Sequence, residues 1–170
     1  MSKSLKRVMK ALMDSGLDIS PLEMPGETRT AQQAAEAAGC GLDQIAKSII
    51  FRGDASGEAL LFLTAGGNRV DAAKATAIAG EPLGKADAAL IRSQTGFAIG
   101  GVSPVGHMNP IRSFFDPRLL DFDVIYAAAG TPRHIFPVTP ADLLRLSGAQ
   151  TADFVNDSSG ADNETQILKH

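Results

Sequence analysis

Two apolar segments joined by a short polar turn constrain the fold more than any other feature of this sequence. Residues 45–52 (IAKSIIFR) and 58–64 (EALLFLT) flank the turn-forming sequence GDASG, which is the pattern of a β-hairpin. Residues 60–63 would be apolar on both faces of an extended chain, which is typical of a central strand. The chain is therefore expected to fold around a sheet.

Helical and extended segments alternate irregularly on both sides of this hairpin. A capping box formed by Thr30 and Gln33 marks one helix start with particular clarity. Helices are expected at residues 5–13, 30–38, 71–79, 87–94 and 139–146, and further extended segments at 19–24, 123–129 and 134–138. We therefore predict the α+β class, with a mixed, largely antiparallel, barrel-like β-sheet flanked by helices.

The length of 170 residues suits one domain. We place that domain at residues 1–150 and expect residues 151–170, which are small and polar, to form a loosely held tail. No apolar run approaches the roughly 18 residues that span a bilayer, and the basic N-terminus does not resemble a signal peptide. A cytoplasmic protein without a membrane partner is expected.

The composition also restricts the possible chemistry. A single cysteine, Cys40, and three histidines make a metal site unpromising, and no cofactor motif is present. The net charge of −3 argues against binding of DNA or of long RNA. Four basic residues share one face of the first helix, where we favour a solvated surface over a stripe that contacts phosphates; they are Lys3, Lys6, Arg7 and Lys10.

The segment GGVSPVGH at residues 100–107 is the most unusual local sequence. It lacks the lysine and hydroxyl residue that follow the last glycine of a phosphate-binding P-loop. Ser103 is an unsuitable nucleophile because Pro104 has no N–H to donate to an oxyanion. Two interpretations remain open: a backbone platform that holds a ligand, or a purely structural tight turn.

Lys47 is the second unusual feature. The two-residue period of a strand places Lys47 on the same side as Ile45, Ile49 and Phe51. A lysine among large apolar side chains either extends its ammonium to solvent at the strand end or meets an anion or a carbonyl in a cleft.

Taken in order along residues 5–146, these motifs resemble the YbaK/ProX family, the free-standing relatives of the editing domain of bacterial prolyl-tRNA synthetases. The resemblance is carried by the T-x-x-x-A-A stretch of the second helix, KSIIF, TGFAIGGVSPVGH, the turn at residues 116–120, AAAGTPRHIF and TPADLL. It implies an editing deacylase that hydrolyses the ester of a mischarged tRNA, most typically a tRNA for proline that carries a small amino acid such as alanine or cysteine.

The resemblance also assigns roles to residues. It implies that Lys47 binds near the terminal adenosine, that residues 100–104 hold the aminoacyl group with backbone atoms, and that Gly130 lines the opposite wall. The expected catalytic residues are therefore Lys47, Gly100 and Gly101, and the expected substrate-binding residues are Val102, Ser103, Pro104, Gly130 and His134.

In that family the 2′-hydroxyl of the terminal ribose assists the reaction, so no metal or protein nucleophile is implied. The expected partners are the acceptor end of mischarged tRNA and prolyl-tRNA synthetase. The alternative is a non-catalytic module that binds aminoacyl-tRNA ends or a small metabolite. We expect His107 to be an ordinary surface imidazole, Cys40 a small buried side chain and Asp116 a helix cap.

Overall fold

The predicted hairpin forms the centre of the sheet in the structure, a computed structural model that describes residues 2–157. β2 (Ile45–Gly53) pairs antiparallel with β3 (Ala59–Ala65), and every residue of β3 is buried. The expectation of a central strand that is apolar on both faces is therefore confirmed.

The remaining strands extend this hairpin into one sheet with the order β1-β7-β6-β2-β3-β5-β8, and β4 pairs with part of β2. Their bounds are β1 Leu22–Glu23, β4 Leu83–Lys85, β5 Arg112–Phe115, β6 Ile125–Ala128, β7 His134–Val138 and β8 Gln150–Thr151. The pairs β2–β6, β3–β5 and β5–β8 are parallel, and the other pairs are antiparallel. The predicted α+β class with a mixed sheet is confirmed, but within residues 2–157 the sheet does not close into a barrel.

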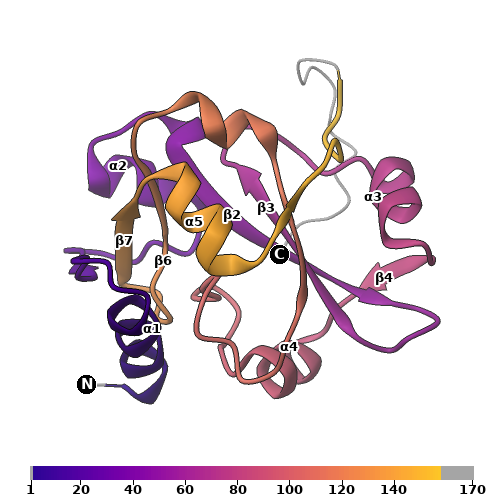
Figure 1. Ribbon diagram of the computed structural model, residues 1–170, viewed down its shortest axis with the longest axis horizontal. Helices are drawn as coiled ribbons and strands as arrows, with labels where there is room; N and C mark the ends of the chain where they lie inside the picture. Colours follow the sequence, from indigo (N-terminus) through magenta and orange to yellow (C-terminus); the bar gives the residue numbers. More distant parts are fainter. Residues whose placement is uncertain (1, 158–170) are drawn as a thin grey trace.

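Within residues 2–157, five α-helices cover the two faces of the sheet. Their bounds are α1 Lys3–Asp14, α2 Ala31–Ala38, α3 Ala72–Ala79, α4 Ala88–Thr95 and α5 Pro140–Ser147. α1, α4 and α5 pack on the large apolar cluster that includes Ala46 and Ile50 of β2. α2 and α3 pack on separate clusters around Ile45 and Phe51, and they lie at opposite ends of the sheet (Figure 1).

The helix boundaries follow the local sequence signals. Thr30 and Gln33 form the expected capping box at the start of α2, and Gly39 ends that helix in the left-handed conformation, with φ of 71°. Asp116 caps the 3₁₀ helix η2 (Pro117–Asp121) by accepting a hydrogen bond from the N–H of Arg118, as expected. A second 3₁₀ helix, η1 (Leu42–Gln44), leads into β2.

The C-terminal segment packs more tightly than the sequence suggested. β8 pairs with β5, Phe154 is fully buried, and Val155 forms a bridge with Val70. The side chain of Lys74 donates hydrogen bonds to Asp153 and Asp157. The loosely held tail expected from residue 151 is therefore wrong for residues 151–157, and residues 158–170 lie outside the described part.

Three strands were not expected from the sequence: β4, β5 and β8. Each has at most four residues and pairs with a segment that is distant in the sequence, so local alternation carried little signal. Among residues 2–157, none of the helices has both the length and the apolar character that crossing a bilayer requires.

Candidate functional site

The strands that pair with one side of β2 diverge along its length, and a cavity lies at this fork of the sheet. β6 pairs with the start of β2, at Ile45 and Ala46, whereas β4 pairs with its end, from Phe51 onward. Within the described chain, no strand lies opposite residues 47–50 on that side. A cavity of about 530 Å³ is lined by these residues, which is a size typical of small-ligand sites.

The cavity has an apolar interior and a polar rim. Nine of its described lining residues belong to the buried hydrophobic core: Ala34, Ile45, Ala46, Ile50, Val70, Ile91, Val102, Ala127 and Ile135. The polar and charged residues of its lining are Thr28, Arg29, Thr30, Lys47, Ser48, Asn68, Arg69 and Tyr126. No Asp or Glu is found among the described residues that line the cavity, so its charged side chains are all cationic.

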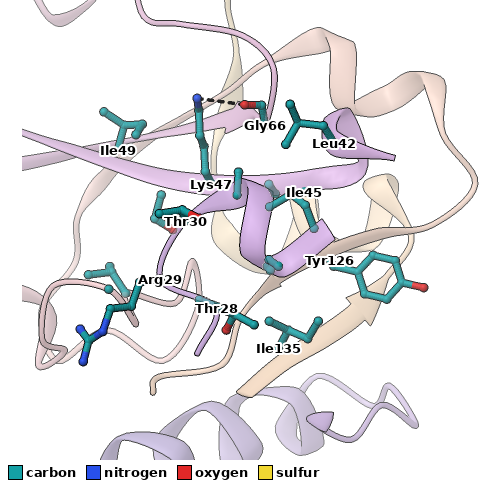
Figure 2. A pocket seen from close by; sticks show the side chains of 18 of the residues that line it. Thr28, Arg29, Thr30, Leu42, Ile45, Lys47, Ile49, Gly66, Tyr126 and Ile135 are labelled. Atoms are coloured by element: carbon teal, nitrogen blue, oxygen red, sulfur yellow. Dashed lines mark hydrogen bonds between the residues drawn. The ribbon is translucent and has the colours of Figure 1, made fainter. Parts of the chain in front are cut away.

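Lys47 projects into this cavity from β2 (Figure 2). Its side chain is half-buried, and its Nζ donates a hydrogen bond to the carbonyl oxygen of Gly66 at 3.2 Å. Of the two interpretations of this lysine, the structure shows a carbonyl contact in a cleft. The side-chain alternation predicted for β2 is also confirmed, because Ile45 and Phe51 pack on one face while Ala46 and Ile50 pack on the other.

The turn that presents the Gly66 carbonyl is held by η1. A Cβ at Gly66 would collide with the backbone carbonyl of Leu42, so only glycine fits there. The N–H of Gly67 donates to the carboxylate of Asp43 at 2.8 Å. The carbonyl that faces the Lys47 ammonium is therefore fixed in position.

The glycine-rich loop supplies a backbone wall to the same cavity. Gly100 and Val102 line it, and Gly100 has a φ of 94°, which favours glycine. A Cβ at Gly100 would come 2.6 Å from Nη1 of Arg29, which also donates to the carbonyl of Ile99 at 3.3 Å. Lys47 and the loop that the sequence singled out thus share one cavity.

Arg7 of α1 anchors both ends of this loop. Its Nη2 donates to the carbonyl of Gly96 at 2.6 Å, its Nε donates to that of Gly106 at 3.2 Å, and its guanidinium lies over the ring of Phe97. The three lysines on the basic face of α1 are exposed, as expected. The expectation of a solvated side chain is wrong for Arg7.

His107 is half-buried and holds the loop through a hydrogen bond, unlike the ordinary surface imidazole that was expected. Its Nε2 donates to the carbonyl of Ser103 at 2.7 Å, and burial, reinforced by the nearby Arg7 charge, lowers its pKa from the ordinary value of 6.5. Ser103 is fully buried, and its Oγ accepts from the N–H of Val105 at 3.1 Å. Ser103 is therefore part of the loop's internal support, in keeping with its dismissal as a nucleophile.

The other predicted site residues lie beside the cavity and outside its lining. Gly101 packs on the backbone of Thr131, so a Cβ there would come within 2.8 Å of it. Gly130 packs on the carbonyl of Ser4, which is different from the opposite wall expected for it. His134 bonds to Oγ1 of Thr131 at 2.6 Å and lines a separate cavity of about 480 Å³. Ser103 and Pro104 are buried without lining either cavity.

Sequence reasoning missed several residues that line the cavity, among them Arg29, Ser48, Asn68 and Arg69. The sequence TAGGNR at residues 64–69, directly after a buried strand, was the available signal for two of them. Asn68 contributes to order there, because its Nδ2 donates to the buried carboxylate of Asp116 at 2.9 Å. No local pattern indicated Arg29 or Ser48.

An apolar interior, a cationic rim and a wall of glycine backbone are features that suit a small ligand with an anionic end. Residues 25–146 match the model of the aminoacyl-tRNA editing domain family, and the chain therefore belongs to that family. The expected resemblance is thus confirmed, and so is the expected class of enzyme, a hydrolase of aminoacyl-tRNA esters.

The chain is also similar to three individual proteins. It is 30% identical over 144 residues to the uncharacterized protein YwhH of Bacillus subtilis (strain 168), covering 85% of this chain and 91% of that protein. A crystal structure described as "a putative trans-editing enzyme for prolyl tRNA synthetase" is 46% identical, with a TM-score of 0.85, covering 92% of this chain and 99% of the other. The crystal structure of the hypothetical protein APE2540 is 28% identical, with a TM-score of 0.81, covering 88% of this chain and 99% of the other.

Proposed function

We propose that this protein is a trans-acting deacylase that removes a small non-cognate amino acid, such as alanine or cysteine, from tRNA for proline in the cytoplasm. In this reaction the oxygen of water bonds to the acyl carbon and the ester bond to the ribose breaks, which releases the amino acid and intact tRNA. The observation that carries the proposal is that Lys47 and the glycine backbone at Gly100 line one cavity.

The interior of the cavity suits a small acyl group. Its walls include core residues that are at most 7% exposed, among them Ile91 and Val102, and such packed side chains yield little to a larger ligand. Binding alone discriminates one methylene by only about 10–200-fold, which is why an editing site that admits only small products is needed. A cavity with a rigid apolar interior can act as that second sieve.

The rim suits the 3′ end of a nucleic acid. Arg29, Lys47 and Arg69 line the cavity, and its described lining residues include no Asp or Glu; Arg29 also pairs with Glu27, which lies outside the lining. The whole chain nevertheless carries a net charge of −3, so favourable electrostatics are local to this site. Contact with the last few nucleotides of the acceptor end, and little beyond them, fits this charge distribution.

Positioning can account for the chemistry. An ester that is held in fixed geometry beside hydrogen-bond donors is activated toward water, and the 2′-hydroxyl of the substrate's own terminal ribose assists in this proposal. The choice of tRNA for proline, and of prolyl-tRNA synthetase as a partner, draws on the 46% identical neighbour described above.

The test is release of amino acid from tRNA for proline that is charged separately with alanine, cysteine or serine. We expect Lys47→Ala to lower kcat/KM by about 100-fold with little change in Tm, since it removes a charged partner of the bound ester. Lys85→Ala is the matched control, because Lys85 is an exposed strand lysine outside the cavity. If the wild-type protein protects the ester from hydrolysis, the chain is the non-catalytic binding module instead.

A further inference from the structure

We infer that the open edge of β2 at Ser48 and Ile50 binds the aminoacyl group of the substrate as if it were one residue of a neighbouring strand. The inference rests on the proposed function and specifies how that site holds its substrate. It assigns the α-ammonium group to the backbone carbonyl of Ser48 and the acyl oxygen to the backbone N–H of Ile50.

The direction of these backbone groups follows from the β2–β3 ladder. Opposite residues of an antiparallel pair alternate between bonded and non-bonded pairs. Gly53 donates its N–H to the carbonyl of Glu58 at 2.8 Å, so this pair is bonded. Because bonded pairs recur every second residue of the register, Ile49↔Phe62 is also a bonded pair. The backbone N–H and C=O groups of Ser48 and Ile50 therefore point away from β3.

Bonds on the far side of β3 agree with this assignment. Leu63, the partner of Ser48, accepts a hydrogen bond through its carbonyl from the N–H of Asp116 at 2.9 Å. Since Asp116 follows β5, on the opposite side of β3 from β2, Leu63 directs its backbone groups away from Ser48. The backbone groups of Ser48 therefore face the fork of the sheet.

These groups have no backbone partner among the described residues. The parallel ladder with β6 ends at Ala46↔Ala127, and the ladder with β4 begins at Phe51↔Lys85. The N–H and C=O of Ser48 and the N–H of Ile50 lie between the two ladders, and no backbone hydrogen bond outside the ladders engages them in residues 2–157. Both residues line the cavity, and the Oγ of Ser48 is also buried without a partner in the described part of the chain.

Unpaired backbone groups that line a cavity between two ladders indicate a ligand that completes the hydrogen bonding of the strand. Buried N–H and C=O groups are nearly always paired, because leaving them unpaired costs free energy. An α-aminoacyl group carries a nitrogen donor and a carbonyl separated as in one peptide residue. In a parallel pair, one residue donates its N–H to a carbonyl of the neighbouring strand and accepts, through its own carbonyl, from the N–H two residues further along that strand. On β2 these two groups are the carbonyl of Ser48 and the N–H of Ile50.

The arrangement also explains the charge of the cavity. The described lining contains no carboxylate to hold the α-ammonium, and a backbone carbonyl at the fork can accept its hydrogen bonds instead. The N–H of Ile50 would face the acyl oxygen, on which negative charge develops during hydrolysis. The edge of β2 therefore both orients the ester and stabilises the reacting oxygen.

Amide hydrogen exchange provides the first test, with 3′-deoxy-3′-(L-alanylamino)adenosine as a non-hydrolysable probe. In the free protein the amide of Ile50 should exchange faster than that of Ile49, whose N–H lies in the β2–β3 ladder. Saturating probe should slow exchange at Ile50 by about 10-fold or more, as expected for a new hydrogen bond. Unchanged exchange at Ile50, whether or not other amides respond, would overturn the inference.

The second test removes the N–H of Ile50 and keeps its side chain, by replacing Ile50 with the corresponding α-hydroxy acid. We expect kcat/KM for alanyl-tRNA to fall by about 100-fold, the effect of removing one oxyanion donor. The same backbone replacement at Phe51, whose N–H lies in the β2–β3 ladder and which does not line the cavity, is the control and should lower Tm instead.

The two proposals fail separately. If wild-type protein releases no amino acid from any charged tRNA, the proposed function fails, whatever the exchange at Ile50. If wild-type protein is active but the Ile50 replacement keeps full kcat/KM, the function stands and the role of the β2 edge is refuted.

Discussion

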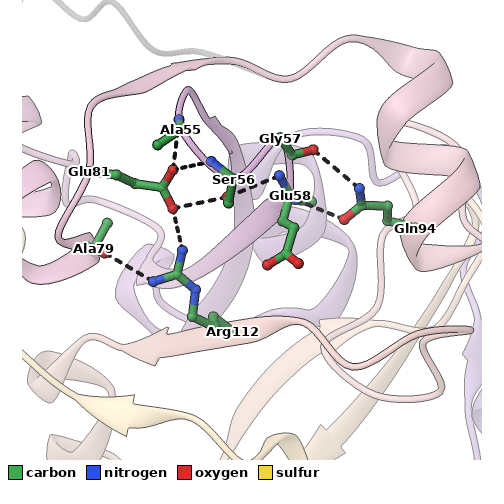
Figure 3. A network of polar contacts seen from close by, with 9 residues as sticks. Ala55, Ser56, Gly57, Glu58, Ala79, Glu81, Gln94 and Arg112 are labelled. Carbon is green, nitrogen blue, oxygen red and sulfur yellow. Dashed lines mark hydrogen bonds and ion pairs between the residues drawn. The ribbon is translucent and has the colours of Figure 1, made fainter.

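Two polar regions of this small domain differ in how completely their hydrogen bonds are satisfied. At the turn of the hairpin, the carboxylate of Glu81 accepts from the N–H groups of Ala55 and Ser56, from the hydroxyl of Ser56 and from Arg112 (Figure 3). Arg112 in turn donates to the carbonyl of Ala79 at 3.0 Å. At the fork of the sheet, by contrast, the Oγ of Ser48 has no hydrogen-bond partner among residues 2–157.

This difference indicates that the turn network stabilises the fold, whereas the fork is available to bind a ligand. The turn network lies outside the lining of both cavities and is closed on itself, so its contribution is to hold the hairpin turn against the segment after α3. The fork keeps polar groups open beside a cavity, which is an arrangement that a ligand can complete. Substitutions at the turn should therefore change stability, and substitutions at the fork should change activity.

A matched pair of glycines gives the largest expected contrast. Gly100 has φ of 94° and lines the cavity, whereas Gly57 has φ of 73° and lies at the hairpin turn, where a Cβ would meet no atom within 4 Å. Each substitution to alanine should cost about 1–3 kcal/mol of folding free energy, because alanine disfavours positive φ. Only Gly100→Ala should also lower kcat/KM, by about 100-fold, since it displaces the backbone wall of the site.

Deacylation rates and thermal unfolding of both variants test this contrast. Gly57→Ala serves as the control for the backbone cost alone. Equal catalytic losses in the two variants would show that the activity depends on global stability and not on the loop at Gly100.

Glu81→Ala should have the next largest effect, which is on stability. The substitution leaves the Nη2 of Arg112 and two N–H groups of the turn without their acceptor, and we expect Tm to fall by several degrees in a domain of this size. The kcat/KM of the folded fraction should remain unchanged. A catalytic defect at a temperature where the variant is fully folded would contradict the separation of the two regions.

The turn network and the glycine-rich loop, which forms one wall of the cavity, should lose stability in different pH ranges. Burial lowers the pKa of His107, so the unfolded chain binds its proton more readily and stability should begin to fall as pH drops below the ordinary value of 6.5. Hydrogen bonds, first that from the Ser56 N–H, lower the pKa of Glu81, so its contribution should be lost only below the ordinary value of 4.5.

Tm measured between pH 7 and pH 3 in wild type, His107→Gln and Glu81→Gln separates these windows. His107→Gln should flatten the decline between pH 6.5 and pH 5, and Glu81→Gln should flatten the part below pH 4.5. The assignment fails if His107→Gln leaves the decline above pH 5 as steep as in wild type.

The features that the sequence could predict are those with local causes. The capping box at Thr30 follows from four consecutive residues, and the face that Lys47 occupies follows from the period of a strand. The unsuitability of Ser103 followed from the proline after it. Each of these depends on short-range geometry, which sequence spacing encodes directly.

The features that escaped prediction depend on which distant segments meet. The fork exists because β2 changes partner from β6 to β4 along its length, and nothing in residues 45–53 encodes that change. Likewise, Gly130 and Gly101 were placed on facing walls, yet Gly101 packs directly on the residue after Gly130. Contacts between distant segments determine these positions, so the local sequence pattern could not predict them.

The smallest expected effect is a change in the free energy of unfolding that has opposite signs in Ser56→Ala and Ser48→Ala. The Oγ of Ser56 donates to Glu81 and accepts from the N–H of Glu58, so Ser56→Ala should destabilise the fold by about 1 kcal/mol. The Oγ of Ser48 is buried without a partner, so Ser48→Ala removes an uncompensated polar atom and should be neutral or stabilising by up to about 1 kcal/mol. Urea unfolding of both variants measures these changes. A loss of stability in Ser48→Ala as large as that in Ser56→Ala would mean that the fork is satisfied internally, and the contrast between the two regions would then disappear.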